Sequence, residues 1–234
     1  MRLLFSWWIP FKNEFITYMR GYKKIIFIIL LSVIFGVIGS RIRELHSDIE
    51  SFVPLVISLY LQFAIISVAI FFAAEAGNVH NTALRTLSFQ PCPRIMLSSL
   101  LIARTIVAVL MCLPPMIVIG IAMGIYEHIP LLLLWSAGVT ITYCFVFGMI
   151  GTLISQPMFP AFIIGWVWDL AIGAGILGNA GKALSIRSHA MDWLGMLIGQ
   201  SYTYDWAPYA LLILAVISLL GYNLALWKKE FPTF

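Results

Sequence analysis

The chain has 234 residues, of which 62% are hydrophobic and 10% are charged, and its mean hydropathy is +0.99. This composition places nearly the whole chain in a membrane, as one domain. The net charge of +4 does not indicate nucleic acid as a partner, because the basic residues cluster at the ends of long apolar runs.

Six apolar runs are long enough, or nearly so, to cross a membrane as helices. A spanning helix needs about 20 apolar residues, and the alternating pattern of a membrane β-barrel is absent from the sequence. We therefore expect an all-α integral membrane protein with a single transmembrane domain over 1–234. The expected spans are 22–40, 52–74, 95–125, 129–154, 159–178 and 207–227.

Residues 1–21 precede the first span and are predicted to form an amphipathic elbow helix in the membrane interface. Its apolar face would hold Leu4, Trp7, Trp8, Phe11, Phe15, Tyr18 and Met19. Such a helix either anchors the chain at the interface or docks a partner on the cytoplasmic leaflet.

A polar segment from Glu75 to Arg94, EAGNVHNTALRTLSFQPCPR, separates the second and third expected spans and must lie at a membrane face. Residues 82–89 are predicted to form a short helix that begins near Thr82. Pro91 and Pro93 end this helix and allow the chain to turn into the third span. The apolar residues that it would present to a partner or to lipid headgroups are Leu84, Leu87 and Phe89. The alternative is an ordinary connecting loop.

Two polar residues lie within the expected spans. Asp169 is about ten residues into the fifth span, roughly 15 Å from the inner face. A charge there costs roughly 2.5–3.5 kcal/mol, so it should face protein or a water-filled path. Asp169 is therefore either a structural residue, hydrogen-bonded to Trp, Tyr or Thr of a neighbouring helix, or part of a translocation path. Gln62 in the second span is a weaker candidate for the same path, and Glu75 and Arg104 are expected to pair near the inner face.

Between the fifth and sixth spans, residues 191–198 form an apolar segment that is too short to cross. We expect a re-entrant or interfacial helix on the outer face there. The positive-inside rule places both termini and the polar segment in the cytoplasm of a multi-pass plasma-membrane protein. The basic residues assigned to the outer loops are Arg41, Arg43, Lys182 and Arg187.

Motifs for catalysis and for metal or cofactor binding are missing. The sequence GNAGK at 178–182 is not a phosphate-binding loop, because Ile176 stands where that motif needs its first glycine and Ala183 where it needs Ser or Thr. The four histidines all fall in predicted loops. We therefore expect no catalytic residue, no bound metal or cofactor and no ATPase activity in this chain.

The polar segment resembles the coupling loop in the permeases of type-2 ATP-binding-cassette exporters. Those permeases carry an acidic residue and a glycine after the second span, then a run such as GTLELLLSLPVSR. Here Glu75 and Gly77 are followed by residues 82–94, and no glycine immediately precedes Thr82. The Leu-Ser-x-x-Pro-x-x-Arg core falls at Leu87, Ser88, Pro91 and Arg94. Six spans, an elbow helix and a basic tail are also similar to that family.

The resemblance implies that two permease subunits, identical or different, pair among the membrane lipids. Each seats a coupling helix in a cleft of a separate cytoplasmic P-loop ATPase, which binds ATP and magnesium. Closure of the ATPases would push on the helices and open a path outward for export. The implied coupling residues are Glu75, Thr82, Leu84, Leu87, Ser88, Phe89, Pro91 and Arg94.

Two other functions stay open. One is a transporter without an ATPase, or a membrane assembly subunit, built around Asp169. The other is a haem or cytochrome-maturation permease, which would need histidines or tryptophans at an outer-face haem site; His128, His189 and Trp193 are the residues that could serve. The sequence favours no substrate.

Overall fold

The computed structural model describes residues 11–12, 15–16, 22–45, 52–77, 93–154, 156–173, 176 and 178–228. Every regular element in these ranges is a helix, and they contain no strand. The expected all-α class is confirmed.

Long helices alternate with short helical segments along the chain. In order they are α2 (Tyr22–Leu45), α3 (Val53–Tyr60), η1 (Leu61–Ile65), α4 (Ile66–Ala73), η2 (Ala74–Gly77), α6 (Pro93–Met123), η4 (Tyr126–His128), α7 (Ile129–Leu153), α8 (Met158–Phe162), η5 (Ile163–Trp168), α9 (Asp169–Gly173), α10 (Gly178–Leu184), α11 (Ile186–Ile198) and α12 (Ala207–Lys228). Segments η1 and η5 are π-helical, whereas η2 and η4 are 3-10 turns.

Five helical stretches in the described part of the chain are long and apolar enough to cross a membrane. They are Ile25–Leu45, Val53–Ala73, Leu97–Met123, Tyr126–Leu153 and Ala207–Lys228. These five correspond to the first four and the last of the expected spans, so the chain is a multi-pass membrane protein.

Of the fifth expected span, 159–178, the structure describes the helix Met158–Gly173, which at 1.5 Å per residue is roughly 24 Å long. Ile176 lies in a turn, so the predicted span does not continue as one helix to residue 178. Helix α10 begins at Gly178, whose φ of +66° is a left-handed conformation that interrupts a continuous helix. Hydropathy did not reveal this break, because the residues around it are glycines and apolar residues, which do not lower the mean hydropathy of the run enough to end it.

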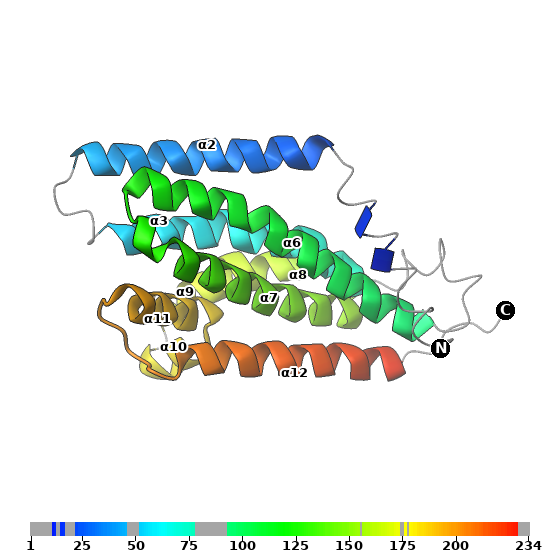
Figure 1. Cartoon of the computed structure of the whole chain (residues 1–234). Coiled ribbons are helices and arrows are strands. Elements are labelled where there is room, and N and C mark those ends of the chain that lie inside the picture. Colours follow the sequence, from blue (N-terminus) through cyan, green and yellow to red (C-terminus); the bar gives the residue numbers. More distant parts are fainter. Residues whose placement is uncertain are drawn as a thin grey trace.

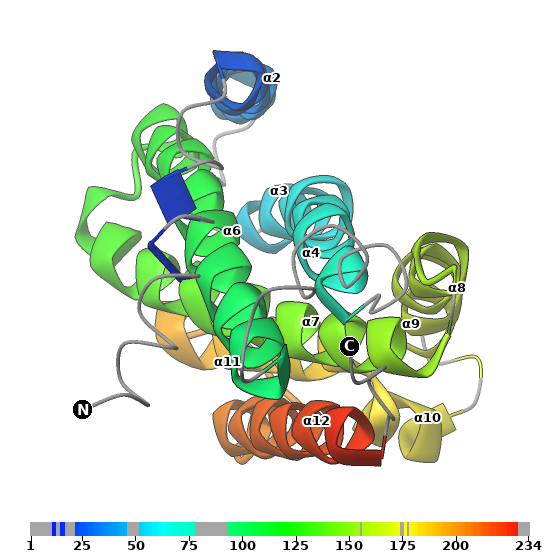
Figure 2. The same ribbon diagram turned by 90° about the vertical axis from the view of Figure 1, so that its right-hand side faces the viewer.

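The long helices run along one axis and alternate in direction (Figure 1). We call one end of the bundle the Leu45 end, where α2 finishes and α3 begins. The other is the Lys228 end, where α12 finishes. Helix α7 packs against α6, α12, α4 and α11, whereas α2 lies at the edge and packs mainly against α6 (Figure 2).

The core follows one stripe of α7. Trp135, Val139, Tyr143 and Phe147 are spaced four residues apart, so they share a helix face, and each is 0% exposed. The Trp135 Nε1–H donates to the Ala190 carbonyl at 2.6 Å, which ties α11 to the centre of the bundle.

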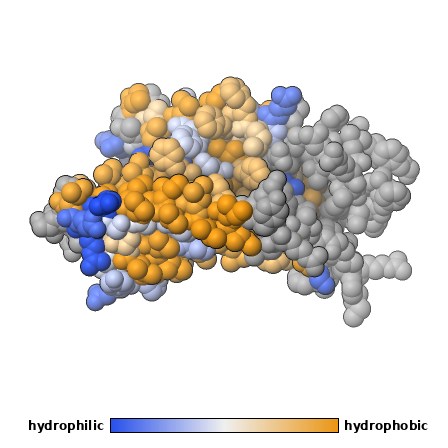
Figure 3. Space-filling model, turned by 90° about the horizontal axis from the view of Figure 1, so that it is seen from above, coloured by the Kyte–Doolittle hydropathy of each residue, from blue (hydrophilic) through white to orange (hydrophobic). Residues whose placement is uncertain are grey.

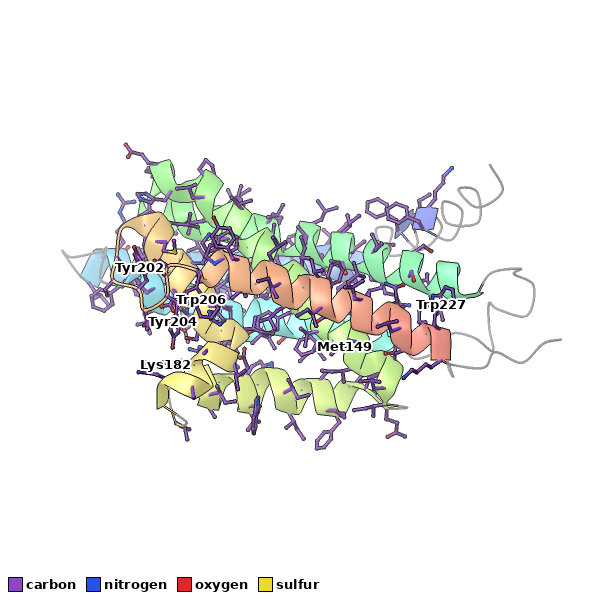
Figure 4. The ribbon with its side chains drawn as sticks, turned by 90° about the horizontal axis from the view of Figure 1, so that it is seen from below. Met149, Lys182, Tyr202, Tyr204, Trp206 and Trp227 are labelled. Carbon is purple, nitrogen blue, oxygen red and sulfur yellow. The ribbon has the colours of Figure 1, made fainter. Side chains whose placement is uncertain are left out.

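The outer surface is apolar. Ile25, Ile29, Val33 and Val37 of α2 are each more than half exposed, which suits contact with lipid and would be unusual in water. Figure 3 shows hydrophobic residues over the middle of this face and hydrophilic ones toward its left end. Trp206 and Trp227 lie near the two ends of α12 (Figure 4), roughly 30 Å apart along the helix, as in the aromatic belts of membrane proteins.

The segment between the short helix and α12 contains the predicted short helix, but more of it is helical than expected. We expected one apolar helix over 191–198, but helix α11 begins at Ile186 and α10 precedes it. Ser185 is the N-cap of α11, and its side chain accepts a hydrogen bond from the Ser188 N–H at 3.1 Å. Helix α11 packs inside the bundle against α7, α12 and α9.

Only a small part of the expected elbow helix is described. Residues 11–12 and 15–16 are helical, and the Phe11 and Phe15 rings stack with their centroids 6.1 Å apart. This contact fits the spacing of one helical turn. The remainder of the predicted elbow helix lies outside the described residues.

At the Lys228 end, α12 holds together the two elements that flank residues 78–92. The buried Tyr222 hydroxyl donates to the Leu97 carbonyl of α6 at 2.7 Å and lies 3.5 Å from the Ala76 carbonyl of η2. Beside it, the Ser98 hydroxyl donates to Asn223 Oδ1 at 2.7 Å. We call these contacts the Tyr222 clasp.

Replacement of Tyr222 by Phe tests the clasp. The ring keeps its packing while a buried hydrogen bond is lost, so the free energy of unfolding in detergent should fall by about 1 kcal/mol. Tyr209→Phe is the control, because Tyr209 is 66% exposed on the same helix. Equal thermal midpoints for the two variants would show that the clasp does not stabilise the bundle.

Candidate functional site

The structure brings Asp169 and Gln62, the two polar residues predicted inside spans, to one site. Gln62 lies in η1 and Asp169 directly follows η5, and each is 5% exposed. Arg187 of α11 lies between them and bonds to both. This site is a buried polar network whose members are Ser58, Gln62, Tyr143, Asp169, Ser185 and Arg187.

Asp169 is surrounded by hydrogen-bond donors. The Tyr143 hydroxyl of α7 donates to Oδ2, and the Ser185 hydroxyl donates to Oδ1 at 2.7 Å. The backbone N–H of Arg187 donates to Oδ2 at 3.1 Å. An ionised carboxylate is an acceptor at both oxygens, so this set of partners matches it. The hydroxyl of a neighbouring-helix tyrosine is the kind of partner that the structural interpretation of Asp169 required.

Asp169 belongs to α9, but its carboxylate lies beside the first turn of α11, which explains part of its hydrogen bonding. The first N–H groups of a helix have no partner within it, and the helix dipole favours a negative charge there. Asp169 supplies that charge to the Arg187 N–H, while Ser185 accepts from the Ser188 N–H. Ser185 and Asp169 thus cap the same helix. Ser185 is its N-cap residue, and Asp169 reaches it from α9.

Arg187 extends the network to the second span. Its Nη1 donates to Gln62 Oε1 at 2.9 Å, and its Nη2 donates to the Ser58 hydroxyl oxygen at 2.6 Å. Ser58 and Gln62 are four residues apart on α3 and η1, so both face the guanidinium. The stem of Arg187 passes Gly173, where an added Cβ would lie 3.2 Å from Arg187 Cδ.

Both π-helical segments adjoin the network. Gln62 lies within η1, and Asp169 follows the last residue of η5. A π-turn holds an extra residue and re-aims the side chains around it, and such turns are frequent at functional sites. At Gly165 in η5, a Cβ would lie 2.7 Å from Ile66 and 2.8 Å from Phe147. Glycine therefore allows η5 to approach α4 and α7.

The two charges of the network are held mainly by neutral groups. The ion pair of Arg41 with Glu44, at 2.9 Å, lies on the surface and outside the network. The guanidinium of Arg187 instead bonds to an amide and a hydroxyl. Ionisable groups inside a membrane are expensive and usually serve function, so this network is the candidate functional site.

Arg187, which was assigned to an outer loop, lies instead in a helix, α11. Its side chain is partly buried in the bundle, where it joins α11 to the second span. Tyr143, Ser58 and Ser185 were also missed. The sequence did hold one usable signal, because Ser185 directly precedes an apolar helical pattern. A serine in that place is typical of a helix N-cap, and it predicts that Arg187 lies in the first turn of the helix.

Most of the predicted coupling residues, namely Thr82, Leu84, Leu87, Ser88, Phe89 and Pro91, lie outside the described residues. Glu75 is in η2 and Arg94 is in the first turn of α6, but their side chains are not described. Arg104 is 8% exposed in α6, and its expected pairing with Glu75 stays a prediction.

A second polar group lies at the Leu45 end. His189 is 1% exposed, and its Nε2 lies 2.9 Å from the Ala183 carbonyl. The rings of Tyr204 and Trp206 lie 5.7 and 4.9 Å from the His189 ring, centroid to centroid. The haem alternative, which named His128, His189 and Trp193, stays a prediction.

Comparison with protein-family models found no match to this chain, and a search of curated proteins found none. The function must therefore be inferred from the residues themselves.

Replacement of Asp169 by Ala tests whether the network stabilises the bundle. The change leaves the Tyr143 and Ser185 hydroxyls and the Arg187 backbone N–H without their acceptor. We expect the free energy of unfolding in detergent to fall by about 3 kcal/mol. Asp205→Ala removes an exposed carboxylate and should change stability little. A loss for Asp169→Ala no larger than that of the control would contradict the network's role.

Proposed function

We propose that this chain is the transmembrane permease subunit of a transporter and that the polar network lies on its substrate path. The observation that carries the proposal is the pair of buried residues Asp169 and Gln62, joined by the partly buried Arg187 within a bundle of spanning helices. A bundle stabilised only by packing has no need for such residues, which are costly at membrane depth.

The depth of the network supports this role. Tyr143 lies roughly 15 Å from the Lys228-end terminus of α7 and roughly 21 Å from its other terminus, at 1.5 Å per residue. The network is therefore near the middle of the bundle, where a transporter must switch access between its two sides.

The unequal contacts of Arg187 suggest where the network opens. Its backbone bonds to the α9 carboxylate and is also fixed by the fold of α11, whereas its guanidinium meets α3 and η1 through a flexible side chain. Of the network's hydrogen bonds, separation of the second span from the α9–α11 unit breaks the two that the guanidinium makes. The π-helical segments on both sides are natural places for such a change of packing.

We further propose that a cytoplasmic P-loop ATPase drives this movement, as the resemblance of residues 75–94 implies. The Lys228 end is then the cytoplasmic face of the plasma membrane, with both termini on that side. The Tyr222 clasp supports a lever role, because it joins both flanks of the coupling segment to α12. The complete transporter pairs this chain with a second permease subunit, and export is the implied direction.

A second candidate is a transporter without an ATPase that couples to protons through Asp169. The observation in its favour is the contact of the carboxylate with two hydroxyls, those of Tyr143 and Ser185, which are able to relay a proton. The two candidates differ in energy source and in the need for an ionisable group at 169.

The double substitution Leu87→Asp with Phe89→Asp tests the coupling helix. Charges at these apolar positions should disrupt packing against the ATPase, so a P-loop ATPase that co-purifies with the wild type in mild detergent should be lost. Leu45→Asp is the control, since Leu45 is 75% exposed at the opposite end. An unchanged complex in the double variant would show that these residues do not contact the ATPase.

Proton movement separates the two candidates. In vesicles reconstituted with the chain alone and an internal pH dye, the permease proposal predicts no proton flux for either wild type or Asp169→Asn. The alternative predicts a flux in the wild type that Asp169→Asn abolishes, because the amide does not ionise. A flux of that kind without any co-purifying ATPase would overturn the proposed function.

A further inference from the structure

The network leaves hydrogen-bond donors unused, and Gln62 is the clearest case. Arginine carries only donors, so the amide oxygen of Gln62 must face Arg187 Nη1, which lies 2.9 Å away. The amide Nε2 then points elsewhere, and it is buried without a hydrogen-bond partner. Because buried polar groups are nearly always paired, this donor indicates a missing acceptor.

Arg187 adds to this surplus. A guanidinium has five N–H groups, and here two of its nitrogens bond to the uncharged Gln62 and Ser58. Both oxygens of Asp169 are already bonded to Tyr143, Ser185 and the Arg187 backbone. The unused capacity next to Gln62 therefore consists of donors, and one of the two groups that supply it carries a positive charge.

We propose that Arg187 and Gln62 bind the anionic group, a carboxylate or a phosphate, of an amphiphilic molecule. Such groups accept hydrogen bonds at several oxygens, and a guanidinium fork fits them better than any other side chain. The inference names a substrate class for the proposed permease and rests on that proposal for the role of the site in transport. Binding itself does not depend on the ATPase.

An apolar surface beside the site favours an amphiphile over a free ion. Phe63 follows Gln62 and is 49% exposed, and its ring meets Trp166 of η5 edge to face at 4.9 Å. Trp166 stacks on Phe162, which is 46% exposed, with centroids 5.5 Å apart. These three rings form an aromatic ladder from the level of Gln62 along η5 and α8. An alkyl chain lying on the ladder keeps its contacts with apolar surface while its head reaches Arg187.

The test measures binding to the purified chain in a neutral detergent by isothermal titration. The probes are dodecyl phosphate, inorganic phosphate and uncharged dodecanol. We expect dodecyl phosphate to bind more tightly than either of the others. Arg187→Gln should weaken it by about ten- to a hundredfold, the equivalent of one hydrogen-bonded charge. Lys182→Gln removes a cation from α10, outside the network, and should leave the affinity for dodecyl phosphate unchanged.

Gln62→Glu is the decisive variant, because it has nearly the same shape. The new carboxylate lies within reach of Arg187 and takes the place of the ligand's anion. We expect its thermal midpoint to equal or exceed that of the wild type while binding of dodecyl phosphate is lost. This variant tests the site even where Arg187→Gln does not fold.

The outcomes are distinct. Equal affinity for inorganic and dodecyl phosphate would overturn the amphiphile and identify a free anion as the ligand. Dodecyl phosphate binding that is undetectable, or that persists unchanged in Gln62→Glu and in any folded Arg187→Gln, would overturn the site altogether. An ATPase that still co-purifies in that case would leave the permease proposal standing, whereas loss of the ATPase complex with intact binding would refute only the coupling mechanism.

Discussion

The structure depends on the need to satisfy buried polar groups where no water is present to do so. Asp169 and Arg187 meet this need together. The carboxylate accepts the Arg187 N–H at the start of α11, and the Arg187 guanidinium bonds to the second span. Without α11 in the bundle, Asp169 would lack two of its three partner residues. The short helix, α11 and the second span are therefore placed by a few hydrogen bonds as much as by packing.

The surrounding fold makes room for these bonds. The two π-helical segments sit next to Gln62 and Asp169, and Gly165 lets η5 approach the central helix that carries Tyr143. Helix α7 then contributes the buried stripe on which the other helices pack. Features that weaken a helix in isolation occur here where the polar network must be aligned, which is the pattern expected of a functional site.

In the proposed permease, a partner at the Lys228 end would act on the network through packed helices. The Tyr222 clasp connects both flanks of residues 78–92 to α12, and α12 packs along α7, which carries Tyr143. The network contacts most easily separated are those of the Arg187 side chain. In the proposed permease, a push on the coupling segment therefore has a continuous path of packed helices to the site where an anionic amphiphile would bind.

By itself, the sequence determined the all-α class, five of the spans and the presence of Asp169 and Gln62 as polar residues inside apolar helices. These predictions succeeded because hydropathy is local and a polar residue within an apolar run is visible without a structure. Only the tertiary structure decided that a turn at Ile176 separates the fifth helix from α10, that α11 packs within the bundle and that Arg187 joins the network. Arg187 and Gln62 are 125 residues apart. No local pattern encodes their contact, because a buried charge is stabilised by whichever groups the fold brings around it.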